Sequence, residues 1–72
     1  MDEWILVEFS ELRDVLIDGT ILGSTNTTFR VQLGTHTITL GGVQNYTPAS
    51  ITAQIFGTTQ GNPKKFTFRV KP

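Results

Sequence analysis

Apolar and polar residues alternate with a period of two along most of this chain. The clearest runs are residues 4–9, 28–33, 35–40, 51–55 and 65–70. Strict alternation is typical of a β-strand that buries one face and exposes the other. The best candidate for a helix, residues 10–16, is too short to be stable and has the β-branched Val15 near its end. The pattern therefore predicts an all-β protein.

A hairpin is predicted near the first third of the chain. Asp18-Gly19 separates Val15-Leu16-Ile17 from Thr20-Ile21-Leu22, and a type I′ turn needs positive φ at both central positions, which Asp and Gly tolerate. A two-residue turn fixes the register, so Leu16 should face Ile21 and Val15 should face Leu22.

Further turn signals divide the rest of the chain. Gly23 is predicted to end the second hairpin strand, and Gly34 to reverse the chain into the strand that His36 opens. Longer loops are expected at residues 41–50 and 57–63. About seven short strands separated by turns predict a small antiparallel β-sandwich, with a small barrel as the alternative. At 72 residues the chain forms one domain, residues 1–72, with a modest core.

Composition and charge exclude several functions. The absence of cysteine removes thiolate chemistry and disulfides. Six acidic and six basic residues cancel, so no overall field attracts nucleic acid or an acidic membrane. No apolar run approaches the roughly 20 residues of a membrane span. All acidic residues lie within residues 2–18 and four bases within 64–71, so opposite charges would face each other if the terminal strands were neighbours.

Several short motifs occur in the order and spacing of a known family. They are Val15-Leu-Ile-Asp-Gly19, Gly23-Ser-Thr25, the run from Leu33 to Leu40 around His36, and Tyr46. In this order the chain resembles the PEGA domain, whose pattern is a V-x-I-D-G hairpin, a G-x-T-P turn, a G-x-H-x-I strand and a G-Y loop. It departs from that pattern at residues 10–14, at Asn26 in place of Pro, and at Asn45 in place of Gly.

The resemblance implies a β-sandwich of transthyretin or carboxypeptidase-regulatory topology, used as an accessory module in bacterial envelope and surface proteins. It implies a carbohydrate or cell-wall ligand and no catalytic residues. Asp18 and Gly19 carry over as turn residues and His36 as the residue that opens a strand. The compartment stays open, because a native start at Met1 would fit a cytoplasmic protein, whereas an excised surface domain would be extracytoplasmic.

Enzymatic chemistry is not expected from the residues themselves. His36 is the only histidine, and its parity with Ile38 and Leu40 predicts a structural role on the inner face near a strand end. No serine lies in a nucleophile-elbow pattern, and the acidic residues lack the spacing of a calcium loop. We therefore expect no catalytic site, no metal site and no cofactor.

Five apolar residues fall on faces that the alternation assigns to solvent. They are Trp4, Leu6, Leu16, Ile21 and Phe56. If they come together, they form an exposed patch of a kind that monomers usually avoid, so either a second layer covers them or they dock a partner. They are the candidate interface for self-association or for a protein partner.

The long loops offer a second candidate contact surface. Asn45 and Tyr46 lie in one loop and Gln60 and Asn62 in another, and an aromatic ring with amides suits a sugar. The sequence therefore favours a non-catalytic binding or spacer module. The alternative is a structural subunit that assembles through edge strands or the apolar patch. A third and less favoured interpretation is an oligonucleotide-binding barrel.

Overall fold

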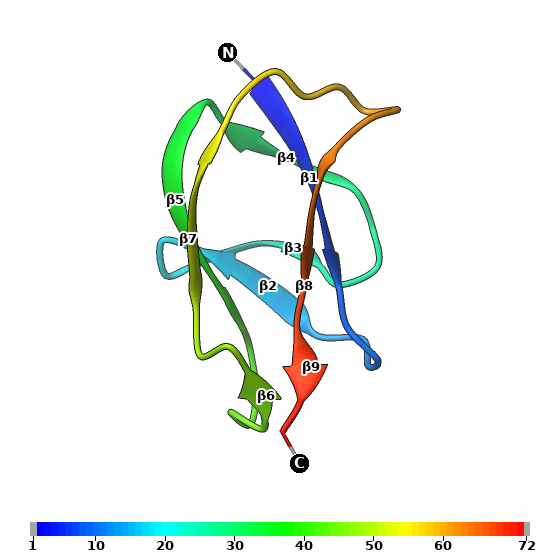
Figure 1. The fold of residues 1–72 in the computed structure, drawn as a ribbon, viewed down its shortest axis with the longest axis vertical. Coiled ribbons are helices and arrows are strands. Elements are labelled where there is room, and N and C mark those ends of the chain that lie inside the picture. Colours follow the sequence, from blue (N-terminus) through cyan, green and yellow to red (C-terminus); the bar gives the residue numbers. More distant parts are fainter. Residues whose placement is uncertain (1, 72) are drawn as a thin grey trace.

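Nine β-strands form among residues 2–71, the residues that the computed structural model describes (Figure 1). They are β1 (Asp2–Glu8), β2 (Asp14–Ile17), β3 (Thr20–Ser24), β4 (Phe29–Gln32), β5 (Gly34–Leu40), β6 (Tyr46–Thr47), β7 (Ile51–Ile55), β8 (Lys64–Thr67) and β9 (Arg69–Val70). No helix forms among residues 2–71, so none there is long and apolar enough to cross a membrane.

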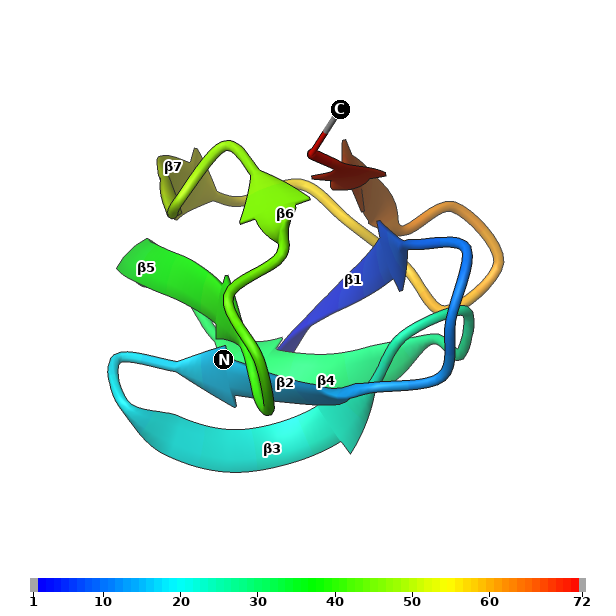
Figure 2. The same ribbon diagram turned by 90° about the horizontal axis from the view of Figure 1, so that it is seen from below.

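The strands form two facing sheets, and the predicted β-sandwich is confirmed. One sheet has the order β4-β1-β8 and the other β3-β2-β5-β7, while β6 and β9 pair separately at one end (Figures 1 and 2). All pairs are antiparallel except β1 with β8, which run parallel.

The core lies between the two sheets and follows the predicted alternation. Its buried side chains are Ile5, Val7, Phe9, Val15, Ile17, Val31, Ile38, Leu40, Tyr46, Ile55, Phe66 and Phe68. Full burial of an aliphatic side chain of this size contributes about 1.5–3 kcal/mol. The alternation fails at two strand ends, where Leu33 and Val70 are exposed because the chain has left the facing sheets.

The predicted hairpin is present, but a bulge alters its register. Asp18 and Gly19 have φ values of 53° and 86°, and Leu16 pairs with Ile21 as expected. Val15, however, pairs with Gly23, so Leu22 is an extra residue on β3 with no partner on β2. The predicted pairing of Val15 with Leu22 is therefore wrong, because a bulge turns one side chain away from the ladder.

Two glycines have roles that differ from those predicted. Gly23 lies within β3, where a Cβ would collide with the ring of Phe29. Gly34 has a φ of +135° and begins β5, and it joins β4 to a strand of the other sheet, so the chain turns a corner between sheets there.

The terminal strands β1 and β8 are neighbours, yet their charges do not pair. The parallel register sets Lys64 beside Ile5 and Lys65 beside Leu6. The ion pairs among residues 2–71 join Glu11 to Arg13, Asp2 to Arg30 and Asp18 to His36, and none uses the C-terminal lysines. The segregated charges therefore do not neutralise each other across the sheet.

Candidate functional site

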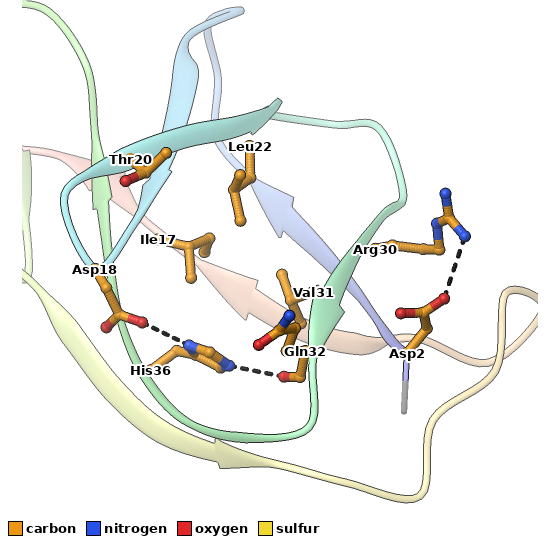
Figure 3. A pocket seen from close by; sticks show the side chains of 9 residues that line it. All are labelled: Asp2, Ile17, Asp18, Thr20, Leu22, Arg30, Val31, Gln32 and His36. Atoms are coloured by element: carbon orange, nitrogen blue, oxygen red, sulfur yellow. Dashed lines mark hydrogen bonds and ion pairs between the residues drawn. The ribbon is translucent and has the colours of Figure 1, made fainter.

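An open pocket of about 560 Å³ lies between β3 and β4, the edge strands by which the two sheets approach each other (Figure 3). Ile17 and Val31, each 3% exposed, line its base, and Leu22 projects into it from β3. We call this pocket the β3/β4 cleft. Its volume is in the range of small-ligand sites.

Local sequence features place these apolar side chains in the cleft. Ile17 is the last residue of β2 before the turn, and Val31 follows the inward parity of β4. Leu22 points into the cleft because it is the extra residue of the bulge in β3. The sequence pattern did not predict this cleft, since neither the bulge nor the approach of the two sheet edges is visible from alternation.

His36 closes one end of the cleft through both of its ring nitrogens. Its Nδ1 lies 2.6 Å from Oδ2 of Asp18, and its Nε2 lies 2.7 Å from the backbone carbonyl oxygen of Gln32 (Figure 3). A carbonyl oxygen and an ionised carboxylate can only accept hydrogen bonds, so the two contacts favour the imidazolium form of the ring, in which both nitrogens carry hydrogen. His36 therefore has no free nitrogen to act as a base or a metal ligand.

His36 and Asp18 shift each other's pKa. The hydrogen bond to Asp18 raises the pKa of His36 above its ordinary value of 6.5, against a smaller opposing effect of burial. The hydrogen bond from His36, with a second from the backbone of Thr37, lowers the pKa of Asp18 below its ordinary value of 3.8. Each group thus stabilises the charged form of the other.

Asp18 also ties the β2–β3 turn to β5. Its backbone N–H donates to the carbonyl oxygen of Thr37 at 2.9 Å, and its Oδ1 accepts from the backbone N–H of Thr37 at 2.9 Å. Asp18 was predicted as a turn residue alone. Its carboxylate joins the turn to β5 and, through His36, to the end of β4.

The opposite end of the cleft carries a second ion pair. Arg30 Nη1 lies 3.2 Å from Oδ2 of Asp2, and both side chains are largely exposed (Figure 3). Exposed pairs of this kind contribute about 0–1 kcal/mol. The charged side chains that line the cleft are Asp2, Asp18, Arg30 and His36. With His36 protonated, their charges sum to zero.

Arg13 organises the far end of the sandwich, and sequence reasoning overlooked it. Its guanidinium donates to the carbonyl oxygens of Gly41 and Val43 at 3.0 and 2.9 Å, to Glu11 at 2.8 Å, and to Oδ1 of Asn45 at 2.8 Å. The Arg13 side chain is only 15% exposed. A single arginine in a charged turn sequence gives no signal of such a role, because its partners other than Glu11 lie about thirty residues away.

Glu3 is a second residue whose role the sequence concealed. It is 6% exposed and accepts hydrogen bonds from the backbone N–H and the hydroxyl of Thr58, at 2.8 and 2.7 Å. These two bonds lower the pKa of the Glu3 carboxyl. Since Thr58 Oγ1 also accepts from the N–H of Trp4 at 2.7 Å, the pair fastens the loop at residues 57–63 to β1.

The four predicted sugar contacts do not converge. Tyr46 is a core residue, 3% exposed, whose hydroxyl bonds the backbone of Leu40, so its prediction as a surface contact is wrong. Asn45 is engaged by Arg13. Gln60 and Asn62 are exposed in the loop at the other end of the molecule (Figure 1). An aromatic residue among loop polar residues was mistaken for a surface residue because the short strand β6 was not predicted.

The five predicted interface residues also separate. Trp4 and Leu6 lie on the outer face of β1, and the guanidinium of Arg30 lies 6.0 Å from the centre of the Trp4 ring. Leu16 and Ile21 lie together on the outer face of the other sheet, which points the opposite way. Phe56 follows β7 and is 65% exposed. The predicted single patch therefore does not form.

No candidate metal site forms among residues 2–71. No group of three or more His, Asp or Glu side chains there could hold a metal ion. Every buried side-chain nitrogen or oxygen in this range has a hydrogen-bond partner. Comparison with protein-family models, with curated proteins and with solved structures finds no match to the chain. The resemblance to the PEGA domain stays a prediction.

Proposed function

We propose that this protein is a non-catalytic interaction module that binds an extended peptide segment in the β3/β4 cleft. One observation carries the proposal: an apolar base formed by Ile17 and Val31 lies open between two strands that are each at the edge of a sheet. An edge strand offers backbone N–H and C=O groups that have no partner strand. A peptide in the cleft can bond some of these groups without forming a continuous ladder, while its apolar side chains pack on Ile17 and Val31.

The charged side chains around the cleft are already paired with each other, which favours a ligand without a strong net charge of its own. Asp2 pairs with Arg30 at one end and Asp18 with His36 at the other. A strongly charged ligand would compete with one of these pairs. An apolar side chain of a peptide could instead pack on Leu22, Ile17 and Val31 without disturbing either pair.

The state of His36 supports binding in preference to catalysis. Both ring nitrogens are committed to acceptors, and Thr20 supplies the one hydroxyl among the residues that line the cleft. A general base needs a free nitrogen within reach of the proton that it removes. The cleft offers recognition groups without that base.

A peptide is favoured over a carbohydrate for a structural reason. The residues that line the cleft include no Phe, Tyr or Trp, and the loops that carry the predicted sugar contacts Asn45, Gln60 and Asn62 lie at two ends of the molecule (Figure 1). The setting that the PEGA resemblance implies, an accessory domain of a bacterial envelope or surface protein, is part of this proposal.

Selection from a display library of random linear peptides tests the function. Selected peptides should shift the NMR signals of β3 and β4, and Leu22→Lys should weaken their binding by about tenfold or more, because it removes an apolar contact and adds a charge to the cleft. Thr27→Lys, in the exposed loop between β3 and β4, adds the same charge outside the cleft and serves as the control. Peptides that bind Leu22→Lys as well as the parent protein, or that shift only other strands, would refute the proposal.

A further inference from the structure

Four strands lie at the edges of the two larger sheets, and three of them carry features that discourage pairing with another chain. β8 begins with Lys64 and Lys65, β4 carries Arg30, and β3 contains the bulge at Leu22. Charged side chains and bulges are the usual means by which proteins protect exposed edges.

The fourth edge strand, β7, has none of these features. Its sequence, Ile51-Thr-Ala-Gln-Ile55, has no charge, no proline and no glycine. All five of its residues pair with β5 in an unbroken antiparallel register. β7 is therefore a regular strand with one unprotected edge, on the side of its sheet opposite the β3/β4 cleft (Figure 2).

We propose that two copies of this chain associate through β7, which pairs antiparallel with its symmetry mate and extends the four-stranded sheet across a two-fold axis. The sequence of β7 is self-complementary in this arrangement. When Ala53 faces Ala53 of the second copy, Ile51 faces Ile55 and Thr52 faces Gln54. An isologous interface needs such self-complementarity, and no like charges meet in it.

The inner face of β7 also favours a second copy. Ile51 and Ala53 pack against the core but remain only partly buried, whereas Ile55 is fully buried. In the two-fold arrangement the side chains of Ile51 and Ile55 from the two copies lie on the same side of the joined sheet. The partner strand therefore covers apolar surface that the single chain leaves accessible.

An exposed aromatic side chain continues this edge. Phe56, 65% exposed, comes directly after β7. If the β5–β7 register continues by one residue, Phe56 lies beside Leu33, another exposed apolar residue. The two-fold pairing sets Ser50 of the second copy on its other side. Phe56 was predicted to be part of an interface, and in this arrangement it contributes to the β7 interface. Trp4 and Leu6 do not take part in it.

The experiment introduces charges at Thr52 and Gln54, which are exposed on the outer face of β7. Thr52→Lys with Gln54→Lys sets lysine against lysine twice in the dimer. Thr52→Lys with Gln54→Glu sets lysine against glutamate in the same two places. Thr27→Lys with Gln44→Lys changes the net charge as much as the first variant does, but in exposed loops, and is the control. Circular dichroism checks that each variant folds.

Sedimentation velocity at low ionic strength, over a concentration series that reaches the millimolar range, gives the readout. We expect a concentration-dependent dimer for the parent chain and for the loop control. The double-lysine variant should dimerise about tenfold or more weakly, and the lysine–glutamate variant should return to within about threefold of the parent. A parent chain that stays monomeric throughout overturns the proposal, as does a double-lysine variant that dimerises like the parent. If the lysine–glutamate variant dimerises as weakly as the double-lysine variant, the proposed register is overturned.

Discussion

Asp18 and His36, eighteen residues apart, are joined by a contact in which the carboxylate oxygen lies 2.6 Å from Nδ1 of the imidazole ring, an ion pair when the ring is protonated. The pair joins the β2–β3 turn to the start of β5, and the second ring nitrogen extends the link to the last residue of β4. Three segments from two sheets are thus held at one end of the cleft by one side chain. The stability of this corner therefore depends on a protonated His36 and an ionised Asp18.

Stability should therefore fall on both sides of a pH window set by this pair. The pKa of His36 is raised, so its contribution is complete below about 6.5 and is lost as the pH rises through the raised value. The pKa of Asp18 is lowered, so its contribution is complete above about 3.8 and is lost as the pH falls through the lowered value. Thermal unfolding across the pH range should show a maximum between these limits.

The variant His36→Gln isolates the alkaline side of this window. Glutamine cannot ionise, so the difference in melting temperature between the parent and the variant should be largest near pH 5–6 and should shrink as the pH rises past the pKa of His36. Lys65→Gln, on the exposed surface of β8, removes a positive charge elsewhere and should leave the pH profile unchanged in shape. A difference between parent and His36→Gln that is constant with pH would show that the ion pair does not contribute to stability.

Gly23 and Phe29 give a prediction about packing. A Cβ at Gly23 would collide with the ring of Phe29, which packs against the core. Gly23→Ala should therefore lower the free energy of unfolding by about 1–3 kcal/mol, as overpacking usually does. Gly61→Ala meets no atom within 4 Å and should be neutral or slightly stabilising. Chemical denaturation of both variants measures the difference, and equal effects would contradict the proposed close approach.

Alternation and turn chemistry predicted most of the fold because both are local. The inward positions of β1, β2 and β5 and the Asp18-Gly19 turn follow from the order of neighbouring residues. The inward parity of His36 was also correct, since it lies beside the cleft on the same face as Ile38. What could not be predicted depends on non-local contacts. The burial of Glu3, for example, arises only when β1 meets the loop at residues 57–63.

The candidate sites were predicted less well than the fold for the same reason. Exposure was inferred from parity within single strands, so residues on different sheets were grouped into one interface. Whether Leu16 and Trp4 share a surface depends on which sheet each strand joins, and the sequence pattern does not contain that information. The cleft escaped prediction because it lies between two strands, β3 and β4, that belong to different sheets.

Thr25 is expected to be the most sensitive polar residue outside the cleft. It is fully buried, its hydroxyl donates to the carbonyl oxygen of Glu11 at 2.7 Å, and it accepts from the N–H of Arg13 at 2.9 Å. Thr25→Val keeps the shape but leaves two backbone groups without a partner, which should cost about 1–3 kcal/mol of stability. Hydrogen exchange should show faster opening at Arg13. The exposed Thr27→Val provides the comparison, and an equally small effect at both positions would contradict the role assigned to Thr25.

Tyr46 gives the sharpest test between its predicted and its observed role. Its hydroxyl bridges the backbone N–H and carbonyl of Leu40, and its ring makes edge contacts with Phe9 and Phe68 at centroid distances of 6.2 and 5.3 Å. Tyr46→Phe keeps these ring contacts but removes the hydroxyl, so it should lower the free energy of unfolding by about 1–3 kcal/mol. Tyr46→Ala should cost about 3–5 kcal/mol, because it also empties part of the core. Urea denaturation measures both losses. If Tyr46→Phe were as stable as the parent but lost binding on a glycan array, Tyr46 would be a ligand contact after all. The buried hydroxyl predicts instead that Tyr46→Phe loses stability and that glycan binding does not depend on it.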